Sequence, residues 1–310
     1  MSYKYLQSTT RILLLLLTLS MSSKLSAQIT AYIRTPLTGQ AYSPVSGTII
    51  NTDAQLSPGM SGNQDDGSVL VNLPFTFTYN GNNFTQVTFC TNGWIGMGNQ
   101  TLSVSAAQGR APGNLFTTTV PNNTLAAWFG DMGANFPAPG GVGSMVHGLA
   151  GNGIYAFEWR NAVGSGFSPT TTNLINFMIK LYGPTSIFPG RIEFLYGTQA
   201  GALTTGRSIG IEDAVGGANR FINAVNGSFT ATTTASAWPG NGNGYRFDPP
   251  TPACSGTPNA GTIVGPSTVC PGNFTISLTG HSYGTGISYQ WQSKPTTGTT
   301  YANVAGATTA

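Results

Sequence analysis

Apolar and polar residues alternate most regularly between positions 73 and 97 of the chain. In the sequence LPFTFTYNG, Phe75, Phe77 and Tyr79 take every second position, which places their rings on one face of a strand. The Asn80-Gly81 pair that follows accepts the positive φ angles of a tight hairpin turn. The pattern therefore predicts a strand that enters a hairpin.

The register of this hairpin depends on the length of its loop. The next apolar run covers residues 84–91, and within it Val87 and Phe89 share a face. A three-residue loop at 80–82 would place these side chains on the face of the first aromatic row, whereas an even loop would place them on the opposite face. Because one buried face is the simpler arrangement, we expect the three-residue loop. A third strand, starting at Trp94, would complete a β-meander.

Short strand patterns recur along the chain as far as residue 248, and no segment shows a helical period of 3.6. Glycine, proline and asparagine clusters separate the runs, as turns require. This pattern predicts an all-β fold, a two-sheet β-sandwich over residues 28–248. The predicted strands outside the meander are 48–50, 125–129, 144–149, 153–159, 174–181, 191–196, 208–212 and 244–248.

A proline cluster, Pro249-Pro250-Thr251-Pro252, ends this domain and predicts a short, semi-rigid linker at 249–253. Two further strand patterns follow, at 274–278 and 287–292. Residues 254–310 are only about half of the roughly 100 residues that a sandwich of the immunoglobulin type requires. We therefore expect an incomplete second β-domain.

The first 27 residues predict a cleaved signal peptide. Lys4 and Arg11 precede the apolar run 12–17, and small residues end the segment at Ser26-Ala27. The run is too short to span a bilayer, which needs about 20 residues; a retained N-terminal anchor is the alternative. We expect an exported, extracellular or outer-surface protein with no integral membrane segment in the mature chain.

The net charge of the mature chain does not indicate which class of partner it binds. The chain has twelve Lys and Arg against nine Asp and Glu, but Lys4, Arg11 and Lys24 belong to the signal, so nine of each sign remain. A neutral mature chain gives no reason to expect nucleic acid. Charged residues make up 7% of the chain and aromatics 11%, which favours strands around an apolar core.

The sequence contains no recognisable catalytic constellation. His147 and His281 are the two histidines, and neither a G-x-S-x-G elbow nor an HExxH motif is present. We expect a structural or surface role for His147. Six carboxylates would be candidates for a glycosidase pair, but several have arginines close by in sequence, which favours ion pairing. They are Asp131, Glu158, Glu193, Glu212, Asp213 and Asp248.

The chain also contains carboxylates and cysteines that bear on metal and thiol chemistry. The adjacent carboxylates Asp65 and Asp66 would contribute to a Ca²⁺ site, which needs six to eight oxygens; the alternative, which we favour, is an Asx-type turn before a strand. The three cysteines, Cys90, Cys254 and Cys270, lack CxxC spacing, so no zinc or redox centre is expected. We expect no cofactor, with calcium left open.

The five tryptophans divide into two groups. Trp94, Trp128, Trp159 and Trp291 lie within apolar strand patterns and are predicted to be core residues. Trp238 lies in a turn-rich loop, where its broad apolar face suits stacking on a sugar ring. The alternative, which we favour, is a lid over one end of the sandwich.

A series of short segments occurs in a characteristic order: Asp65-Asp66, LPFTFTYNG (73–81), TNGWIGMG (91–98), the strand that ends in Asp131, FEWRN (157–161), IEFLYG (192–197) and SIGIED (208–213). In this order they resemble the N-terminal jelly-roll module of large secreted bacterial surface proteins, which is distantly similar to nidogen-like sandwiches. The resemblance covers most of residues 30–248. Cys90 stands where the module usually has a small hydroxyl residue.

The second region contains C-x-G-x-P-x-x-G at 254–261, VCPG at 269–272 and YQWQS at 289–293. With these motifs it resembles the start of an Ig-like repeat. The resemblance implies a truncated Ig-like β-sandwich after the jelly-roll-like one, export by the type IX route, and pairing of Cys254 and Cys270 with cysteines further along. Cys90 would then be the free thiol.

Together these observations predict a secreted or cell-surface, non-enzymatic adhesin or structural protein built of β-sandwich modules. Its partner would be a surface glycan or protein bound by loops. The alternative is a carbohydrate-binding module of a secreted enzyme whose catalytic domain lies beyond residue 310. We expect no catalytic, cofactor or metal residues.

Overall fold

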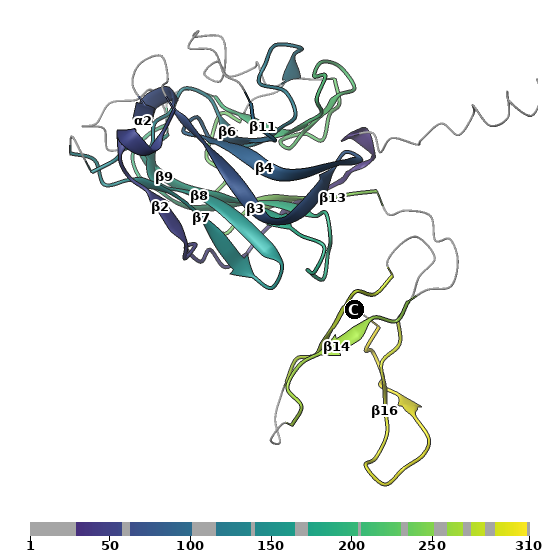
Figure 1. Cartoon of the computed structure of the whole chain (residues 1–310). Coiled ribbons are helices and arrows are strands. Elements are labelled where there is room, and N and C mark those ends of the chain that lie inside the picture. The colour runs from purple at the N-terminus through teal and green to yellow at the C-terminus, as the bar shows by residue number, and fades with distance from the viewer. Residues whose placement is uncertain are drawn as a thin grey trace, which may run out of the picture.

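The computed structural model describes residues 29–57, 63–100, 116–137, 140–164, 173–203, 206–230, 235–250, 259–268, 274–282 and 289–308. The predicted signal peptide, Cys254, Cys270 and the end of the linker lie outside these residues. The first part of the chain forms two antiparallel sheets that pack face to face (Figure 1). The prediction of an all-β sandwich is confirmed.

One layer is a six-stranded sheet in the order β12-β11-β6-β5-β4-β3. Consecutive strands β3 to β6 are neighbours, as expected for a meander. The bounds of its strands are β3 (Ser68–Tyr79), β4 (Asn82–Cys90), β5 (Trp94–Met97), β6 (Thr124–Phe129), β11 (Ser208–Glu212) and β12 (Phe221–Asn223).

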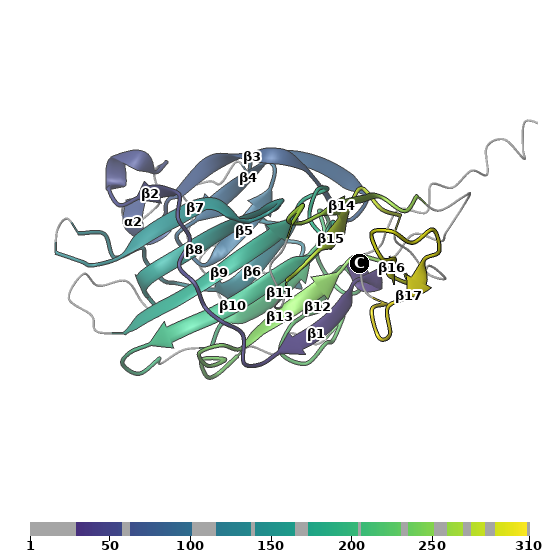
Figure 2. The same cartoon turned by 90° about the horizontal axis from the view of Figure 1, so that it is seen from below.

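The other layer is a seven-stranded sheet in the order β1-β13-β10-β9-β8-β7-β2. Figure 2 looks onto this sheet and shows the segment between β1 and β2 crossing over the strands from one edge to the other. The bounds of its strands are β1 (Ile33–Leu37), β2 (Thr48–Ile50), β7 (Ser144–Gly151), β8 (Ile154–Val163), β9 (Leu174–Tyr182), β10 (Ile192–Gln199) and β13 (Gly244–Asp248).

Short helical segments punctuate the strands. The 3₁₀ turns η1 (Ile29–Ala31) and η2 (Asp53–Gln55) lie near the N-terminus, and a single helical turn, α2 (Asn63–Asp66), comes directly before β3. No described helix is long and apolar enough to cross a membrane.

The hairpin between β3 and β4 corrects our expectation about its loop. The loop has two residues, Asn80 and Gly81, both at positive φ (48° and 79°), and Tyr79 pairs with Asn82. The apolar rows still share a face, because the register shifts further along the hairpin, between Asn72 and Phe77. This irregularity restores the parity that the even loop removes.

The space between the sheets is filled by aromatic and aliphatic side chains from both layers. Trp128 and Trp159, together with Phe77, Phe89 and Phe177, are at most 1% exposed and belong to this central core. The rings of Trp159 and Phe177 stack 4.6 Å apart, which adds geometric preference to the burial of apolar area.

Each sheet also has a small apolar cluster on its outer face. On the seven-stranded sheet the cover is the segment 38–47, which contributes Val45 and Tyr42 to a cluster with Met178. On the six-stranded sheet Phe116 packs against Trp94 and other buried side chains. The prediction that Trp94 is a core residue is confirmed, with its side chain in this outer cluster.

The described residues between 259 and 308 contain two separate two-stranded antiparallel sheets. Strands β14 (Thr262–Val264) and β15 (Ser277–Thr279) form one sheet, and β16 (Gln292–Ser293) and β17 (Ala302–Asn303) form the other. Trp291, predicted as a core residue of this region, is only half-buried. The described strands here are two or three residues long and carry no fully buried side chain.

Candidate functional site

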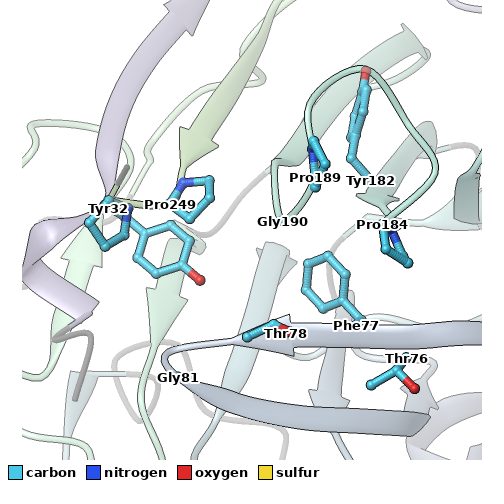
Figure 3. A pocket seen from close by; sticks show the side chains of 12 residues that line it. Tyr32, Thr76, Phe77, Thr78, Gly81, Tyr182, Pro184, Pro189, Gly190 and Pro249 are labelled. Carbon is cyan, nitrogen blue, oxygen red and sulfur yellow. The ribbon is translucent and has the colours of Figure 1, made fainter. Parts of the chain in front are cut away.

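A groove of about 250 Å³ opens at the end of the sandwich where the linker begins. It lies between β3 and the loop that joins β9 to β10. Figure 3 shows side chains of β3 on one side, prolines of the loop opposite, and Tyr32 with Pro249 at one end. The lining residues are Tyr32, Thr76, Phe77, Thr78, Gly81, Tyr182, Gly183, Pro184, Pro189, Gly190, Pro249 and Pro250.

The groove contains no charged side chain among its lining residues. Its walls are rings and prolines, and its polar groups are hydroxyls and main-chain atoms. The hydroxyl of Tyr182 donates a hydrogen bond of 2.6 Å to Glu193, and burial raises the pKa of this tyrosine. Such a surface suits an uncharged ligand with apolar faces and a few hydroxyl or amide groups.

A group of three carboxylates lies at another place in the sandwich. Asp65 and Asp66 end the helical turn α2, and Asp131 follows β6; carboxylate oxygens of the three lie within 4.8 Å of one another. The sequence identified the first two residues, whereas the approach of Asp131 is set by the tertiary structure. Three carboxylates at this spacing are a candidate cation site.

Polar neighbours also hold this acidic group. The Asn92 amide donates to Asp66 at 3.1 Å and accepts from the main-chain N–H of Met132 at 3.0 Å. The buried Arg207 guanidinium donates to the main-chain oxygen of Asp131 at 2.7 Å. These contacts tie α2 to the loop after β6, so the group has a structural use as well.

The other candidate carboxylates are spread over the two sheets. Glu158 pairs with Arg160 at 2.7 Å, Asp213 with Arg220 at 3.2 Å, and Asp248 with Arg191 at 2.6 Å. Ion pairing, which the sequence favoured for the carboxylates near arginines, therefore occurs. Glu212 differs from them: it is fully buried and has no ion pair with a described residue.

The predicted structural role of His147 agrees with its surroundings. This half-buried histidine stacks on Phe157 at 6.2 Å, and its Nδ1 lies 2.8 Å from the hydroxyl of Tyr155. Burial lowers its pKa, so it remains neutral at physiological pH.

Trp238 packs as a lid instead of presenting an open face. Its indole N–H donates to the main-chain oxygen of Gly197 at 3.1 Å. Its ring meets Trp128, Phe177 and Tyr196 edge to face at 5.0 to 6.1 Å. Of the two interpretations made from the sequence, these contacts favour the lid.

Cys90 is a free, buried cysteine at the end of β4. Burial raises its pKa to about 12, so the thiol stays protonated and unreactive. Its main-chain oxygen accepts a hydrogen bond of 2.9 Å from the Trp159 indole, which links the two sheets.

The fold and these sites define a two-sheet β-sandwich module. A model of the NIDO-related family matches residues 31–249, which is more than two thirds of the chain. The chain therefore belongs to the NIDO-related family, and the nidogen-like resemblance is confirmed. No curated protein matches the chain, and neither does any solved structure.

Proposed function

We propose that this chain is a secreted or cell-surface, non-enzymatic protein that adheres through its NIDO-related sandwich or spaces other modules. The observation that carries the proposal is that several of its acidic side chains and one histidine are engaged in structural contacts. Glu158, Asp213 and Asp248 are committed to ion pairs, and His147 is packed among aromatic rings. Each of these ion pairs lies within one sheet or at the ends of its strands, and none of these groups is among the residues that line the groove.

The recognition surface in this proposal is the groove at the linker end. Its charge-free lining would take an uncharged part of a surface glycan or of an extended protein segment. Loops and strand ends of a rigid sandwich are a common place for such binding. Thr76 and Thr78 offer hydroxyls, while Tyr32 and the prolines offer apolar faces.

The second candidate is a carbohydrate-binding module of a secreted enzyme. The same groove supports it, because rings beside hydroxyls suit a sugar. Trp238, the residue first considered for sugar stacking, is occupied by its contacts with the core, so a sugar would use Tyr32 instead. An attached catalytic domain and a preference for polysaccharide substrates would distinguish this module from an adhesin.

The experiment compares the mature chain, residues 28–310, with two threonine variants. Thr76→Arg places a charge and bulk in the groove, and Thr85→Arg makes the same change at an exposed position on neighbouring β4, outside the groove. Each protein is applied to a glycan array and to surfaces coated with mucin or fibronectin. We expect binding that falls at least about tenfold in Thr76→Arg and is unchanged in Thr85→Arg.

Three results would count against the proposal. Equal binding by both variants would place the ligand outside the groove. Binding restricted to polysaccharides of one enzyme's substrate class would favour the carbohydrate-binding module. Turnover of an ester, peptide or glycoside substrate by the same purified chain would show an enzyme. Export is tested separately, by N-terminal sequencing of secreted protein, where we expect Gln28 first.

A further inference from the structure

Glu212, the last residue of β11, is the buried acid that has no basic partner among the described residues. Its side chain lies on the outer face of the six-stranded sheet, because its neighbours Ile209 and Ile211 face the core. One carboxyl oxygen, Oε2, accepts from the Thr124 hydroxyl at 3.3 Å. The other, Oε1, is buried and accepts no hydrogen bond from any described residue.

Asn122 supplies a second buried oxygen that lacks a hydrogen-bond donor among the described residues. Its amide nitrogen donates to the main-chain oxygens of Thr118 (3.4 Å) and Val215 (3.1 Å), which fixes which way the amide faces. Its Oδ1 is buried and, within the described part of the chain, has no hydrogen-bond donor. The segment that holds this amide is the one that covers the outer face of the sheet.

Gly216 shows that these oxygens converge. This buried glycine has φ +69°, and a Cβ placed on it would lie 2.7 Å from Asn122 Oδ1 and 2.8 Å from Glu212 Oε1. The main-chain oxygen of Thr117 would lie 2.1 Å from the same point. These three oxygens, from separate positions in the chain, are therefore close neighbours beside a residue without a side chain.

The charged and hydroxyl groups nearby donate no hydrogen bond to Glu212 Oε1 or Asn122 Oδ1 among the described residues. Asp213 Oδ1 accepts from the main-chain N–H groups of Val215 and Gly216, and its Oδ2 pairs with Arg220. The Tyr79 hydroxyl donates to the main-chain oxygen of Glu212 and not to its carboxyl group. Acceptor oxygens that face one another in a buried place need a proton or a cation between them.

We propose that Glu212 Oε1, Asn122 Oδ1 and the main-chain oxygen of Thr117 bind a hard divalent cation, Ca²⁺, with water completing its coordination. A carboxylate, a side-chain amide and a main-chain carbonyl are the oxygen ligands that calcium takes in proteins. Thr117 and Asn122 are half-buried residues of the covering segment, whereas Glu212 Oε1 and Asn122 Oδ1 themselves are buried. Three protein ligands and one carboxylate suit the weak, roughly millimolar affinity of extracellular calcium modules.

A proton competes with the cation for this position. Without a cation, burial raises the pKa of Glu212 to about 10, and the protonated acid would donate from Oε1 to Asn122 Oδ1. Calcium must displace this proton, so calcium binding should strengthen as the pH rises. Among the described residues, Asp213 and Tyr79 are the titratable groups that interact with Glu212, and Asp213 is paired with Arg220 at 3.2 Å.

The test is calcium titration of the chelator-treated mature chain, followed by calorimetry and by thermal unfolding at pH 6 and pH 8. We expect Ca²⁺ at about 10 mM to raise the unfolding temperature, more at pH 8 than at pH 6, and more than Mg²⁺ does. Glu212→Gln should remove the response. This variant is expected to fold, because its amide nitrogen takes the place of the proton and donates to Asn122.

Two further variants locate the cation. Asn122→Ala changes a half-buried loop residue and should weaken calcium binding without unfolding the sheet. Asp66→Asn changes the separate acidic group with Asp65 and Asp131, and should keep the calcium response. Loss of the response in Asp66→Asn, with Glu212→Gln unaffected, would place calcium at that group and overturn the proposal. So would a wild-type chain with no calcium response at pH 8, which would leave only the protonated acid at Glu212.

Discussion

The outer face of each sheet is covered by a chain segment that buries one glutamate, yet the two glutamates have different partners. On the seven-stranded sheet, residues 38–47 cover Glu158, and on the six-stranded sheet, the segment from Phe116 covers Glu212. The two side chains are 1% and 0% exposed. The difference lies in what the cover and the strand offer to the carboxyl group.

Glu158 is surrounded by donors. Arg160 lies two residues further along β8 and contacts Glu158 Oε2 at 2.7 Å. The cover adds the main-chain N–H of Val45 to the same oxygen at 2.8 Å and the Tyr42 hydroxyl to Oε1 at 3.0 Å. Arg160 also donates to the main-chain oxygen of Val45, so the ion pair fastens the cover to the sheet.

Glu212 receives one hydroxyl and otherwise faces oxygens. Burial is therefore the same at the two places, while the expected state of the acid is not: an ion pair on one face, and a proton or a bound cation on the other. The comparison teaches that burial determines the free-energy cost of ionising the carboxyl group. The hydrogen-bond donors and cations nearby determine whether the group is ionised or protonated.

The largest predicted effect comes from removing the partner of Glu158. Arg160→Met would leave a buried carboxylate without its cation and would release the cover, so we expect a loss of about 3 kcal/mol in the free energy of unfolding. Urea unfolding at pH 7 with a chelator measures it. The control is Arg220→Met, since Arg220 is 51% exposed in its pair with Asp213 and should cost less than about 1 kcal/mol.

Equal losses in the two arginine variants would break the comparison. They would mean that the pair on the covered face is no more valuable than a half-exposed one. A larger loss in Arg220→Met would point instead to the loop after β11 as the critical contact.

The second prediction concerns pH and Glu212 in chelator. Its pKa is raised from 4.5 in the unfolded chain to about 10 in the folded protein. The folded state therefore keeps a proton that the unfolded state loses. The free energy of unfolding should fall as the pH rises from 4.5 towards 10, by up to about 1.4 kcal/mol per pH unit, and its contribution is fully present only below pH 4.5.

Glu212→Gln removes this proton and supplies the comparison. Between pH 5 and pH 8 the variant should lose less stability than the wild type, so the difference between them should grow with pH in urea titrations. Parallel curves for the two proteins would show that Glu212 is ionised without a cation, as in an ordinary solvated carboxylate.

The two glutamates also show how far the sequence predicts the partners of a buried carboxyl group. Arg160 follows Glu158 at i+2 in FEWRN, which puts both on one face of a strand, so their pairing was foreseen. Nothing near Glu212 in sequence signals Asn122, about 90 positions earlier. The same holds for Asp131 beside Asp65 and Asp66, because both contacts arise only when distant segments close over a sheet.

Short-range patterns predicted most strands but missed those that depend on pairing. Strand β1 contains Pro36 and lies at a sheet edge, where proline is tolerated, and the three-residue β12 also escaped detection. The prediction of the hairpin loop was wrong because it assumed a regular register. The shift between Asn72 and Phe77 does not interrupt the alternation of apolar residues and so cannot be seen in the sequence. The Ig-like character of residues 254–310 and the type IX route stay predictions.

The smallest predicted effects test single donors on the two faces. Tyr42→Phe keeps the ring in its cluster but removes the hydroxyl that donates to Glu158 at 3.0 Å, so we expect a loss of about 1.5 kcal/mol, typical of a bond to a charged group. Thr124→Val removes the 3.3 Å bond to Glu212, which is longer and reaches a neutral acid, and should cost about 0.5 kcal/mol. Urea unfolding at pH 7 in chelator compares them. A greater loss in Thr124→Val would reverse the assignment of charge, because it would mean that the acid under the Phe116 segment is the ionised one.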